Sequence, residues 1–514
     1  MKLLTWSVAF LTLGPVAFAL DGQIGIHDPS TLIKCDGKFY VYGTGGTPLV
    51  SDDGWTWRPG AVPSDIGLAP DVIRVGDRYH MYVARNVGAQ PKAEITLISN
   101  RTLDPDSPDF KWEKGGVVAS TDGVEDCNGI DPGVLLDPQT GKLWLTYGSY
   151  FGYIRMVELD PKTGRRADPK AKPLDIAINC EASVLDYHDG WYYLLATHGS
   201  CCQGANSNYN LRVGRSRNVK GPFLDHNGLD MMEGGGKLFL GSESRVVGPG
   251  HYGRLDLGDG VEVFSYHYEA DLDRGGASVL AIRPLLWRDG WPVAGENAKA
   301  GNYMIESVRT GTVLELSVEG VSLTPRRGGP GGPPGIGGPG SGPMPGPPAA
   351  GAPAASGAAP APRPPGPGGR VRPSNGPPIP AQDVAVVSKN WPEGEIATRL
   401  ANYLDQAQQK WTLRAAPQAG GYPGAPYFQI MVAGTDRSLA ATADGELTTV
   451  PAFTGAPEQL WAIQQLTDGS YRIMPKAVPG SPTPLALSAV GSGFATLAKF
   501  DATSARQRWN LKGL

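Results

Sequence analysis

The sequence predicts an all-β protein, a five-bladed β-propeller followed by a second β domain built of three units. The first observation is a pattern of short strands that occurs five times between about residues 21 and 298. The second is a Gln-x-Trp triplet that occurs three times in the C-terminal part. The third is that the N-terminal part has no long stretch of helical periodicity. The 514 residues also exceed the usual size of one domain.

Each N-terminal repeat begins with a polar residue on a short segment, followed by a Gly-containing turn such as Asp36-Gly37, an aromatic-rich strand and a further strand. In the first repeat these strands are expected at 39–42 and 48–51. Repeats of roughly 40 to 50 residues built of short strands are typical of propellers, in which the first strand of each blade lines the axis. We therefore expect the five polar residues to surround one end of the channel: Asp28, Asp71, Asp131, Glu181 and His251.

The N-terminus resembles a secretory signal. Lys2 precedes an apolar run, 3–18, that is too short to span a bilayer, and Ala17-Phe18-Ala19 has the small-x-small pattern of a cleavage site. We expect a signal peptide at 1–19 and a secreted or periplasmic protein after cleavage near Ala19, with no membrane span. The net charge of −4 and the lack of a basic block speak against nucleic-acid binding.

The five cysteines are too few for a disulfide scaffold in a chain of this length, and no Cys-x-x-Cys pair suggests a structural zinc site. Cys201 and Cys202 are adjacent. The sequence leaves open whether they form a disulfide or remain two thiols.

The C-terminal Gln-x-Trp triplets end at Trp411, Trp461 and Trp509, which are 50 and 48 residues apart. This pattern resembles the ricin-type β-trefoil (ricin B lectin-like), in which the tryptophans pack in a shared core. The resemblance implies a trefoil over 299–514 whose units open near Tyr303, Tyr427 and Tyr471. A Gly/Pro-rich insertion at about 325–380 interrupts the first unit, and its composition predicts disorder. Glu315, with Asn402, is the candidate for a sugar pocket.

Carboxylates that face one cleft are the minimum apparatus for hydrolysing a glycosidic bond. One must be ionised to activate water, and another must stay protonated to donate to the leaving oxygen. Asp28, Asp131 and Glu181 are the candidates, and their spacing alone leaves the roles open. Asp71 is expected to bond backbone amides instead.

Several motifs together resemble glycoside hydrolase family 43, and in particular its endo-arabinanases. They include His27-Asp28-Pro29, Ile130-Asp131-Pro132, Glu181-Ala182 and the run from Ser200-Cys201-Cys202 to Gly234-Gly235-Gly236. The resemblance implies an inverting glycosidase with Asp28 as general base, Glu181 as general acid and Asp131 tuning and orienting the acid. Inversion corresponds to a base-to-acid separation of roughly 6.5–9.5 Å.

The same resemblance implies that His251 faces a Ca²⁺ ion on the propeller axis. It also implies sugar-binding loops, made of Asn128, Gly129, Ile130, Ser149, Tyr150 and Phe151. The expected substrate is a plant cell-wall polysaccharide, arabinan or the arabinose-containing side chains of pectin, cut internally at α-1,5 bonds. Two alternatives stay open: an exo-acting α-L-arabinofuranosidase or β-xylosidase of the same family, and a carbohydrate-binding protein without activity. The sequence does not indicate the oligomeric state.

Overall fold

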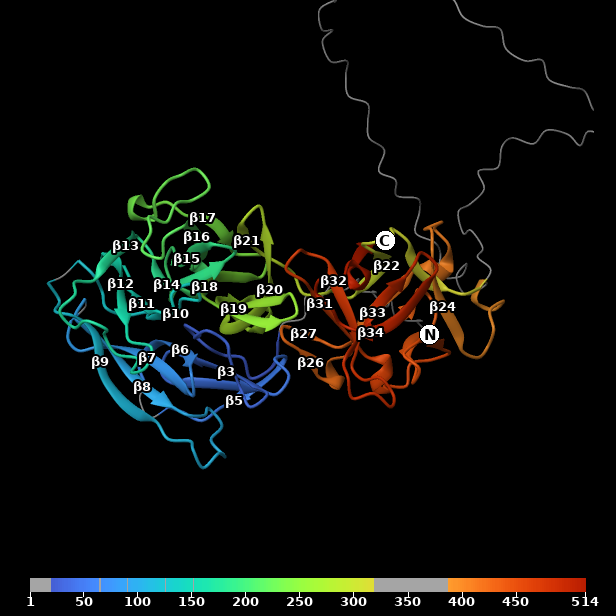
Figure 1. Cartoon of the computed structure of the whole chain (residues 1–514), viewed down its shortest axis with the longest axis horizontal. Helices are drawn as coiled ribbons and strands as arrows, with labels where there is room; N and C mark the ends of the chain where they lie inside the picture. The colour runs from blue at the N-terminus through green and yellow to red at the C-terminus, as the bar shows by residue number, and fades with distance from the viewer. Residues whose placement is uncertain (1–19, 64–65, 90, 125, 151, 319–386) are drawn as a thin grey trace, which may run out of the picture.

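The computed structural model describes residues 20–63, 66–89, 91–124, 126–150, 152–318 and 387–514. The predicted signal peptide and the predicted Gly/Pro-rich insertion lie outside these residues. The described elements are almost all β-strands, joined by short 3-10 helices. Within the described residues no helix is long and apolar enough to cross a membrane. Figure 1 shows two bodies side by side, a propeller coloured blue to lime and a C-terminal barrel coloured mainly orange to red.

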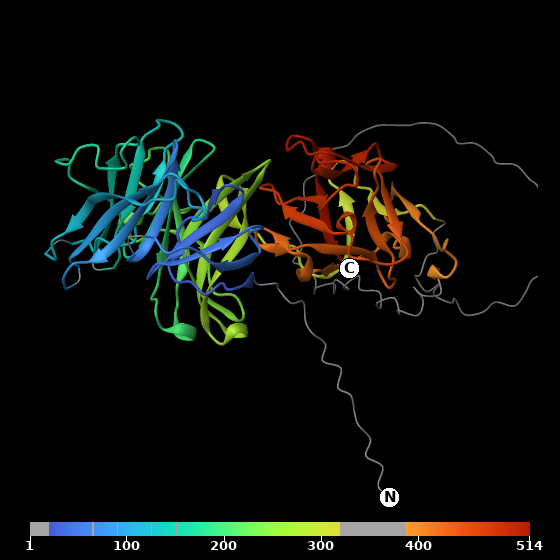
Figure 2. The same ribbon diagram turned by 90° about the horizontal axis from the view of Figure 1, so that it is seen from below.

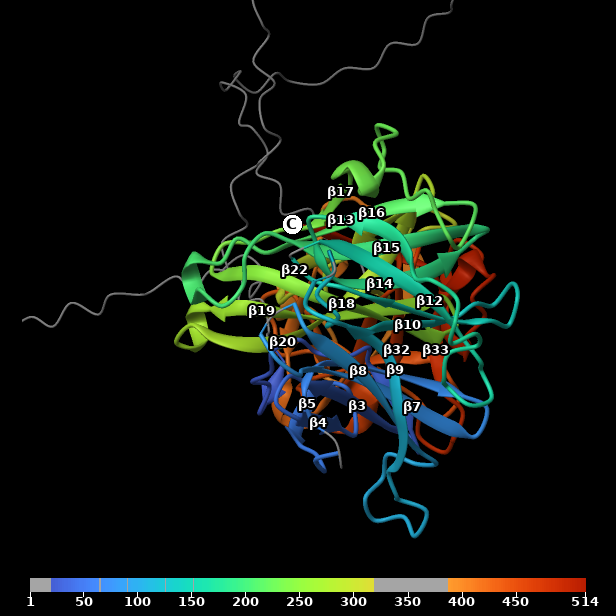
Figure 3. The same ribbon diagram turned by 90° about the vertical axis from the view of Figure 1, so that its left-hand side faces the viewer.

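The predicted five-bladed propeller is confirmed, because five sheets follow one another along the chain. Figure 1 looks along their common axis, and Figure 3 shows the propeller from the side, with its strands running across the view. In the first blade, β1 (Asp21–Gly22) adds to the outer edge parallel to β5. The strands of the five blades are β2 (Ile33–Cys35), β3 (Lys38–Gly43), β4 (Thr47–Ser51) and β5 (Thr56–Pro59); β6 (Leu68–Val75), β7 (Arg78–Asn86), β8 (Ala93–Asn100) and β9 (Glu113–Thr121); β10 (Gly133–Leu136), β11 (Leu143–Tyr147), β12 (Tyr153–Leu159) and β13 (Leu174–Ile178); β14 (Glu181–His188), β15 (Trp191–His198), β16 (Asn210–Ser216) and β17 (Lys237–Leu240); β18 (Val246–Gly258), β19 (Val261–Asp271), β20 (Ala277–Arg288) and β21 (Trp291–Ala294).

Asp-Gly pairs make several of the hairpins. In Asp36-Gly37, Asp189-Gly190, Asp259-Gly260 and Asp289-Gly290 both residues have positive φ, between 46° and 80°. Two successive residues with positive φ define the type I′ turn, whose twist matches that of the flanking strands, and Asp-Gly is among its preferred sequences. The Asp-Gly turns at 36–37, 189–190 and 259–260 therefore fix where the second strand of their blades begins, as the sequence predicted.

The ring closes through the start of the described chain. Gly25 forms a bridge to Val279, and the amide of Leu280 donates to the carbonyl of Ile24 at 2.8 Å. Residues 24–26 thus extend the last blade along β20, while the chain that follows them enters the first blade. This closure brings residues about 240 positions apart in sequence into contact near the axis.

The C-terminal body is a closed barrel. Ten of its strands form one sheet, which two additional pairings, β23–β22 and β28–β31, close on itself. A further hairpin pairs β33 with β34. Its longer strands are β22 (Gly301–Ser307), β23 (Val313–Leu316), β24 (Ile396–Ala401), β25 (Trp411–Ala415), β28 (Phe428–Val432), β29 (Ser438–Ala441), β30 (Leu447–Val450), β31 (Trp461–Gln465), β32 (Tyr471–Pro475), β33 (Leu485–Val490), β34 (Phe494–Lys499) and β35 (Trp509–Gly513), and two short strands, β26 (Gly421–Tyr422) and β27 (Ala425–Pro426), form a separate ribbon.

Threefold repetition is visible in the hydrogen bonds of the barrel. Trp411, Trp461 and Trp509 are fully buried, and each indole N–H donates to a backbone carbonyl, those of Leu314, Leu439 and Leu487. The glutamine of each triplet accepts an amide N–H from a residue five or six positions earlier. These contacts confirm the prediction that the three tryptophans belong to the core.

The predicted sugar pocket around Glu315 is wrong. Its side chain is 2% exposed. One oxygen accepts from Arg399 at 2.7 Å and the other accepts from Gln409 at 2.7 Å. Glu315 therefore holds the barrel wall together and presents no carboxylate at the surface.

The barrel packs against the first and last blades of the propeller (Figure 2). Asp53 accepts the amide N–H of Gly421 at 2.9 Å, and the amide of Thr467 donates to the carbonyl of Gly260 at 3.0 Å.

Candidate active site

One residue near the start of each inner strand has a left-handed backbone. These residues are Asp28, Ala69, Asp131, Ala182 and His251, with φ between 42° and 61°. Positive φ is uncommon outside glycine, and where it occurs it often marks a functional constraint. In blades two, four and five this left-handed residue lies within a β-bulge, which changes the direction of the neighbouring side chains. Asp28 itself lies in a bend before β2 and not on a strand.

Asp71 does not join the other four polar residues. It follows the left-handed Ala69 by two positions, so its side chain points elsewhere. Its two oxygens accept the amide N–H groups of Thr31 and Val134, both at 2.9 Å. Asp71 thereby ties blade two to the inner strands on either side, as the sequence suggested, and the expected convergence of all five polar residues is wrong for this one.

Asp28 is surrounded by hydrogen-bond donors and histidines. Its Oδ2 accepts from Thr44 at 2.7 Å and lies 2.9 Å from His27 Nδ1, while its Oδ1 lies 3.5 Å from His251 Nδ1. Burial by itself would raise the pKa of this carboxyl, but the two histidines outweigh it and hold the pKa well below its usual range. Asp28 is therefore ionised at neutral pH.

Glu181 has the opposite electrostatic setting. Its side chain is nearly buried, and it accepts hydrogen bonds from Ser149, at 2.5 Å, and from the hydroxyl of Tyr209. Burial raises the pKa of Glu181, with a contribution from the negative charge of Asp28, and this outweighs the two hydrogen bonds. Two carboxyls in one site thus have pKa values displaced in opposite directions, as an acid and base pair requires.

Asp131 is the third carboxyl of the site, and the charges of both Asp28 and Glu181 act on it. It is 7% exposed. Its Oδ2 accepts the amide N–H of Ala182, the neighbour of Glu181, at 3.3 Å. Burial and the charges of Glu181 and Asp28 raise the pKa of Asp131 well above its usual range. The structure therefore brings Asp28, Asp131, Glu181 and His251 together.

Three further residues of the site escaped the sequence reasoning: His27, His267 and Glu269. His27 Nε2 lies 2.9 Å and His267 Nε2 lies 3.1 Å from the same oxygen of Glu269. The two imidazole rings stack at 4.7 Å. Only the pair His267 and Glu269 had a signal in the sequence, because the two residues are two apart on one strand and therefore share a face.

The predicted sugar-binding loops adjoin Glu181. Asn128 and Ser149 form an isolated bridge, and the amide of Gly148 donates to the carbonyl of Ile130 at 2.8 Å. Both polar atoms of the Asn128 side chain are buried without a hydrogen-bond partner in the described residues, a costly state for a polar group.

Gly129 packs against Thr121, which receives its amide hydrogen bond at 3.2 Å. Tyr150 is half-buried, and burial with the charge of Glu181 raises its pKa to about 12. Phe151 lies outside the described residues.

The side chains around His251 offer few ligands of their own to the expected calcium ion, which would be held mainly by water, and the calcium site stays a prediction. Calcium prefers six to eight oxygen ligands, whereas a single carboxylate, Asp28, pairs with His251. Within the described residues one group of three potential ligand side chains occurs, and it consists of His27, His267 and Glu269. Its donors are mainly nitrogen and are engaged in hydrogen bonds with one another. A calcium ion therefore has no part in the chemistry proposed below.

Comparisons with known proteins agree with this site. The model of glycosyl hydrolases family 43 matches residues 42–292, so it does not cover the barrel, and the ricin-type resemblance there stays a prediction. The extracellular exo-α-(1→5)-L-arabinofuranosidase of Cellvibrio japonicus is 31% identical over 308 residues, which cover 53% of this chain and 87% of that protein. The extracellular endo-α-(1→5)-L-arabinanase 1 of Bacillus subtilis is 30% identical over 294 residues, which cover 52% of this chain and 87% of that protein.

Among solved structures, an exo-1,5-α-L-arabinanase from a bovine ruminal metagenomic library superposes with a TM-score of 0.50 and 33% identity, covering 53% of this chain and 97% of that one. The propeller fold, the grouped carboxyls and these relatives agree. The chain belongs to glycosyl hydrolase family 43 and is a glycosidase.

Proposed function

We propose that this glycosidase hydrolyses α-1,5-arabinofuranosidic bonds within arabinan and inverts the configuration at the anomeric carbon. The observation that carries the proposal is the opposite displacement of two pKa values, that of Asp28 downward and that of Glu181 upward. The substrate class is supported by relatives that are named as acting on α-(1→5)-linked arabinose polymers.

In the proposed reaction Asp28 is the general base and removes a proton from the attacking water. Glu181 is the general acid and donates its proton to the leaving glycosidic oxygen. Asp131 supports the acid in two ways: the neighbouring carboxyls of Asp131 and Glu181 disfavour a second negative charge beside the first, and Asp131 accepts the amide N–H of Ala182, which fixes the backbone beside the acid. The proposed sugar-binding loops lie beside the acid, since Ser149, which forms an isolated bridge with Asn128, donates to Glu181.

The alternative exo mode has specific support, since relatives of both modes match the propeller with similar identity. The product profile on debranched arabinan separates the two modes. Early accumulation of oligosaccharides of several lengths supports internal cleavage, whereas one short product from the beginning supports exo cleavage. Absence of hydrolysis, or full activity in Asp28→Ala, would refute the proposed chemistry.

We also propose that the protein is exported and acts on plant cell-wall arabinan or on the arabinose-containing side chains of pectin. The two relatives described above are named extracellular, which supports export. Amino-terminal sequencing of the protein recovered from the culture medium tests this, with a mature terminus next to Ala19 as the expected result.

A further inference from the structure

Glu269 is a buried carboxylate that the proposed reaction does not use. It lies on β19, in the last blade, and its side chain is 2% exposed. Burying a charge is costly unless donors surround it. Here the donors are His27, His267 and the amide N–H of Cys202, the last at 2.6 Å. Burial would raise the pKa of Glu269, but these contacts lower it to about 2, so it is ionised.

The hydrogen-bond partners assign the proton positions on both histidines. His267 Nδ1 accepts the backbone N–H of Asp28 at 2.9 Å, so its proton is on Nε2 and is donated to Glu269. His27 faces a carboxylate with each nitrogen, Asp28 at Nδ1 and Glu269 at Nε2. Both nitrogens must therefore donate, and His27 is an imidazolium.

We propose, on the basis of the function proposed above, that Glu269 is a positioning residue for the general base. It fixes His27 and His267 against Asp28, one through the carboxylate and the other through the backbone amide. The base belongs to the first blade and Glu269 to the last, so this contact holds the base across the seam at which the ring closes.

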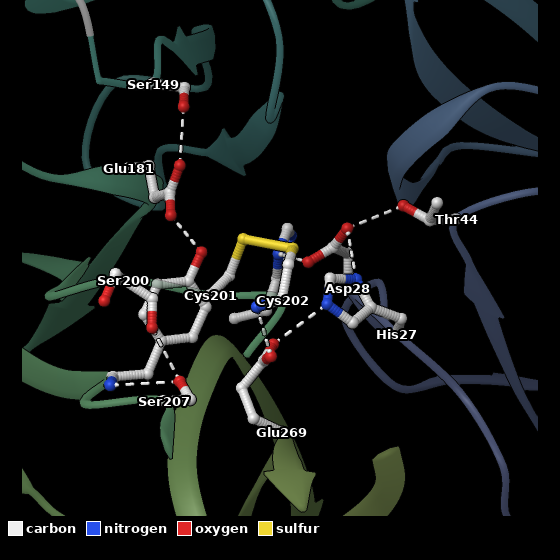
Figure 4. Close-up of a disulfide and its surroundings, with 12 residues drawn as sticks. His27, Asp28, Thr44, Ser149, Glu181, Ser200, Cys201, Cys202, Ser207 and Glu269 are labelled. Atoms are coloured by element: carbon white, nitrogen blue, oxygen red, sulfur yellow. Dashed lines mark hydrogen bonds and ion pairs between the residues drawn. A yellow bond between two sulfur atoms is a disulfide. The ribbon is translucent and has the colours of Figure 1, made fainter. Parts of the chain in front are cut away.

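The loop of blade four is attached to the same carboxylate. Cys201 and Cys202 form a disulfide, which answers the question that the sequence left open. A bond between neighbouring residues closes a small ring and restricts the backbone of the loop, including the amide that donates to Glu269 (Figure 4). Blades one, four and five therefore meet at Glu269, and the ionised carboxylate keeps His27 charged beside Asp28.

The charged groups near this cluster come from several blades. His251 and Asp131 act on Asp28 from blades five and three, and Glu181 acts from blade four. Glu269 faces His27, His267 and the amide of Cys202. Removing its charge thus affects the base through two histidines, without touching the acid.

The test compares Glu269→Gln, Glu269→Asp and the control Glu262→Gln on debranched arabinan. Glu262 is on the same strand and is also buried, but its partners are Arg254 and Trp287, away from Asp28. We expect Glu269→Gln to lower kcat about 10- to 100-fold, since small misplacement of a reacting group costs up to that much. KM should stay within about threefold. Glu269→Asp, which keeps the charge on a shorter side chain, should recover part of kcat.

Nitrogen-15 NMR of histidine-labelled protein at pH 7 gives a readout that is independent of substrate. With seven histidines the spectrum is simple to assign by His27→Gln and His267→Gln. We expect His27 to be protonated on both nitrogens in the wild type and in Glu262→Gln, and on one nitrogen in Glu269→Gln.

Unchanged kcat in Glu269→Gln, an equal loss in Glu262→Gln, or an unchanged His27 spectrum would overturn the positioning role. If the wild type failed to hydrolyse arabinan, the proposed substrate would be wrong, and the His27 spectrum would still decide the role of Glu269.

Discussion

Replacing Tyr209 by Phe removes one of the two side-chain donors to the proposed acid, Glu181. A donor to a carboxylate stabilises its ionised form, so its loss raises the pKa of Glu181 further. The acid then keeps its proton to higher pH, and the alkaline limb of the pH profile of kcat/KM, which reports the proposed acid, moves upward.

The size of the shift follows from the hydrogen bond that is lost. Bonds to charged groups contribute about 1.5–3 kcal/mol, and one pKa unit corresponds to about 1.4 kcal/mol. Because Glu181 is only 9% exposed, water replaces little of the lost bond, and we expect an upward shift of about one to two units.

The assay is kcat/KM on debranched arabinan from about pH 4 to pH 10. Tyr193→Phe is the matched control, because its hydroxyl is in the same blade and donates to the carbonyl of Gly290 at 2.7 Å instead. Its alkaline limb should coincide with that of the wild type. An alkaline limb that stays in place or moves to lower pH in Tyr209→Phe would refute the assignment of Glu181 as the acid.

Three further predictions concern the base, the barrel and acid stability. Asp28→Asn should lower kcat about 10²- to 10⁴-fold, the usual contribution of a general base, in protein that circular dichroism shows to be folded; substantial residual turnover would exclude Asp28 as the base. Trp461→Ala should reduce the free energy of unfolding of the barrel by about 3–5 kcal/mol in urea denaturation, because a fully buried indole leaves a cavity. The pKa of Glu269 is lowered from 4.5 to about 2 in the folded protein. Its ionised carboxylate therefore stabilises the fold fully above about pH 4.5, and this stabilisation is lost as the pH falls toward 2. In thermal melts the melting temperature of Glu269→Gln should fall less between pH 4.5 and pH 2 than that of the wild type.

The sequence predicted the blades well because their signals are local. An Asp-Gly pair such as Asp36-Gly37 specifies a hairpin turn, and aromatic strands such as 39–42 follow it directly. The three tryptophans of the barrel were predicted for the same reason, since each carries its own short motif.

What sequence reasoning missed depends on register and on distant contacts. The residue with the left-handed backbone is Asp28 in blade one but Ala69 in blade two. Matching the blades by residue type therefore paired Asp28 with Asp71, whereas the structural equivalent of Asp28 is Ala69, two positions earlier. Glu269 was missed because its partner His27 lies 242 residues earlier, and the ring closure that joins them has no local signal. Glu315 was misread because its partner Arg399 lies beyond the long insertion.

The most direct test of the central claim, an ionised base and a protonated acid that invert the anomeric carbon, is proton NMR of the first product formed from debranched arabinan. The account predicts that the β-anomer of the new reducing end appears first and that the α-anomer grows in later by mutarotation. Initial appearance of the α-anomer, or unchanged polymer, would contradict it.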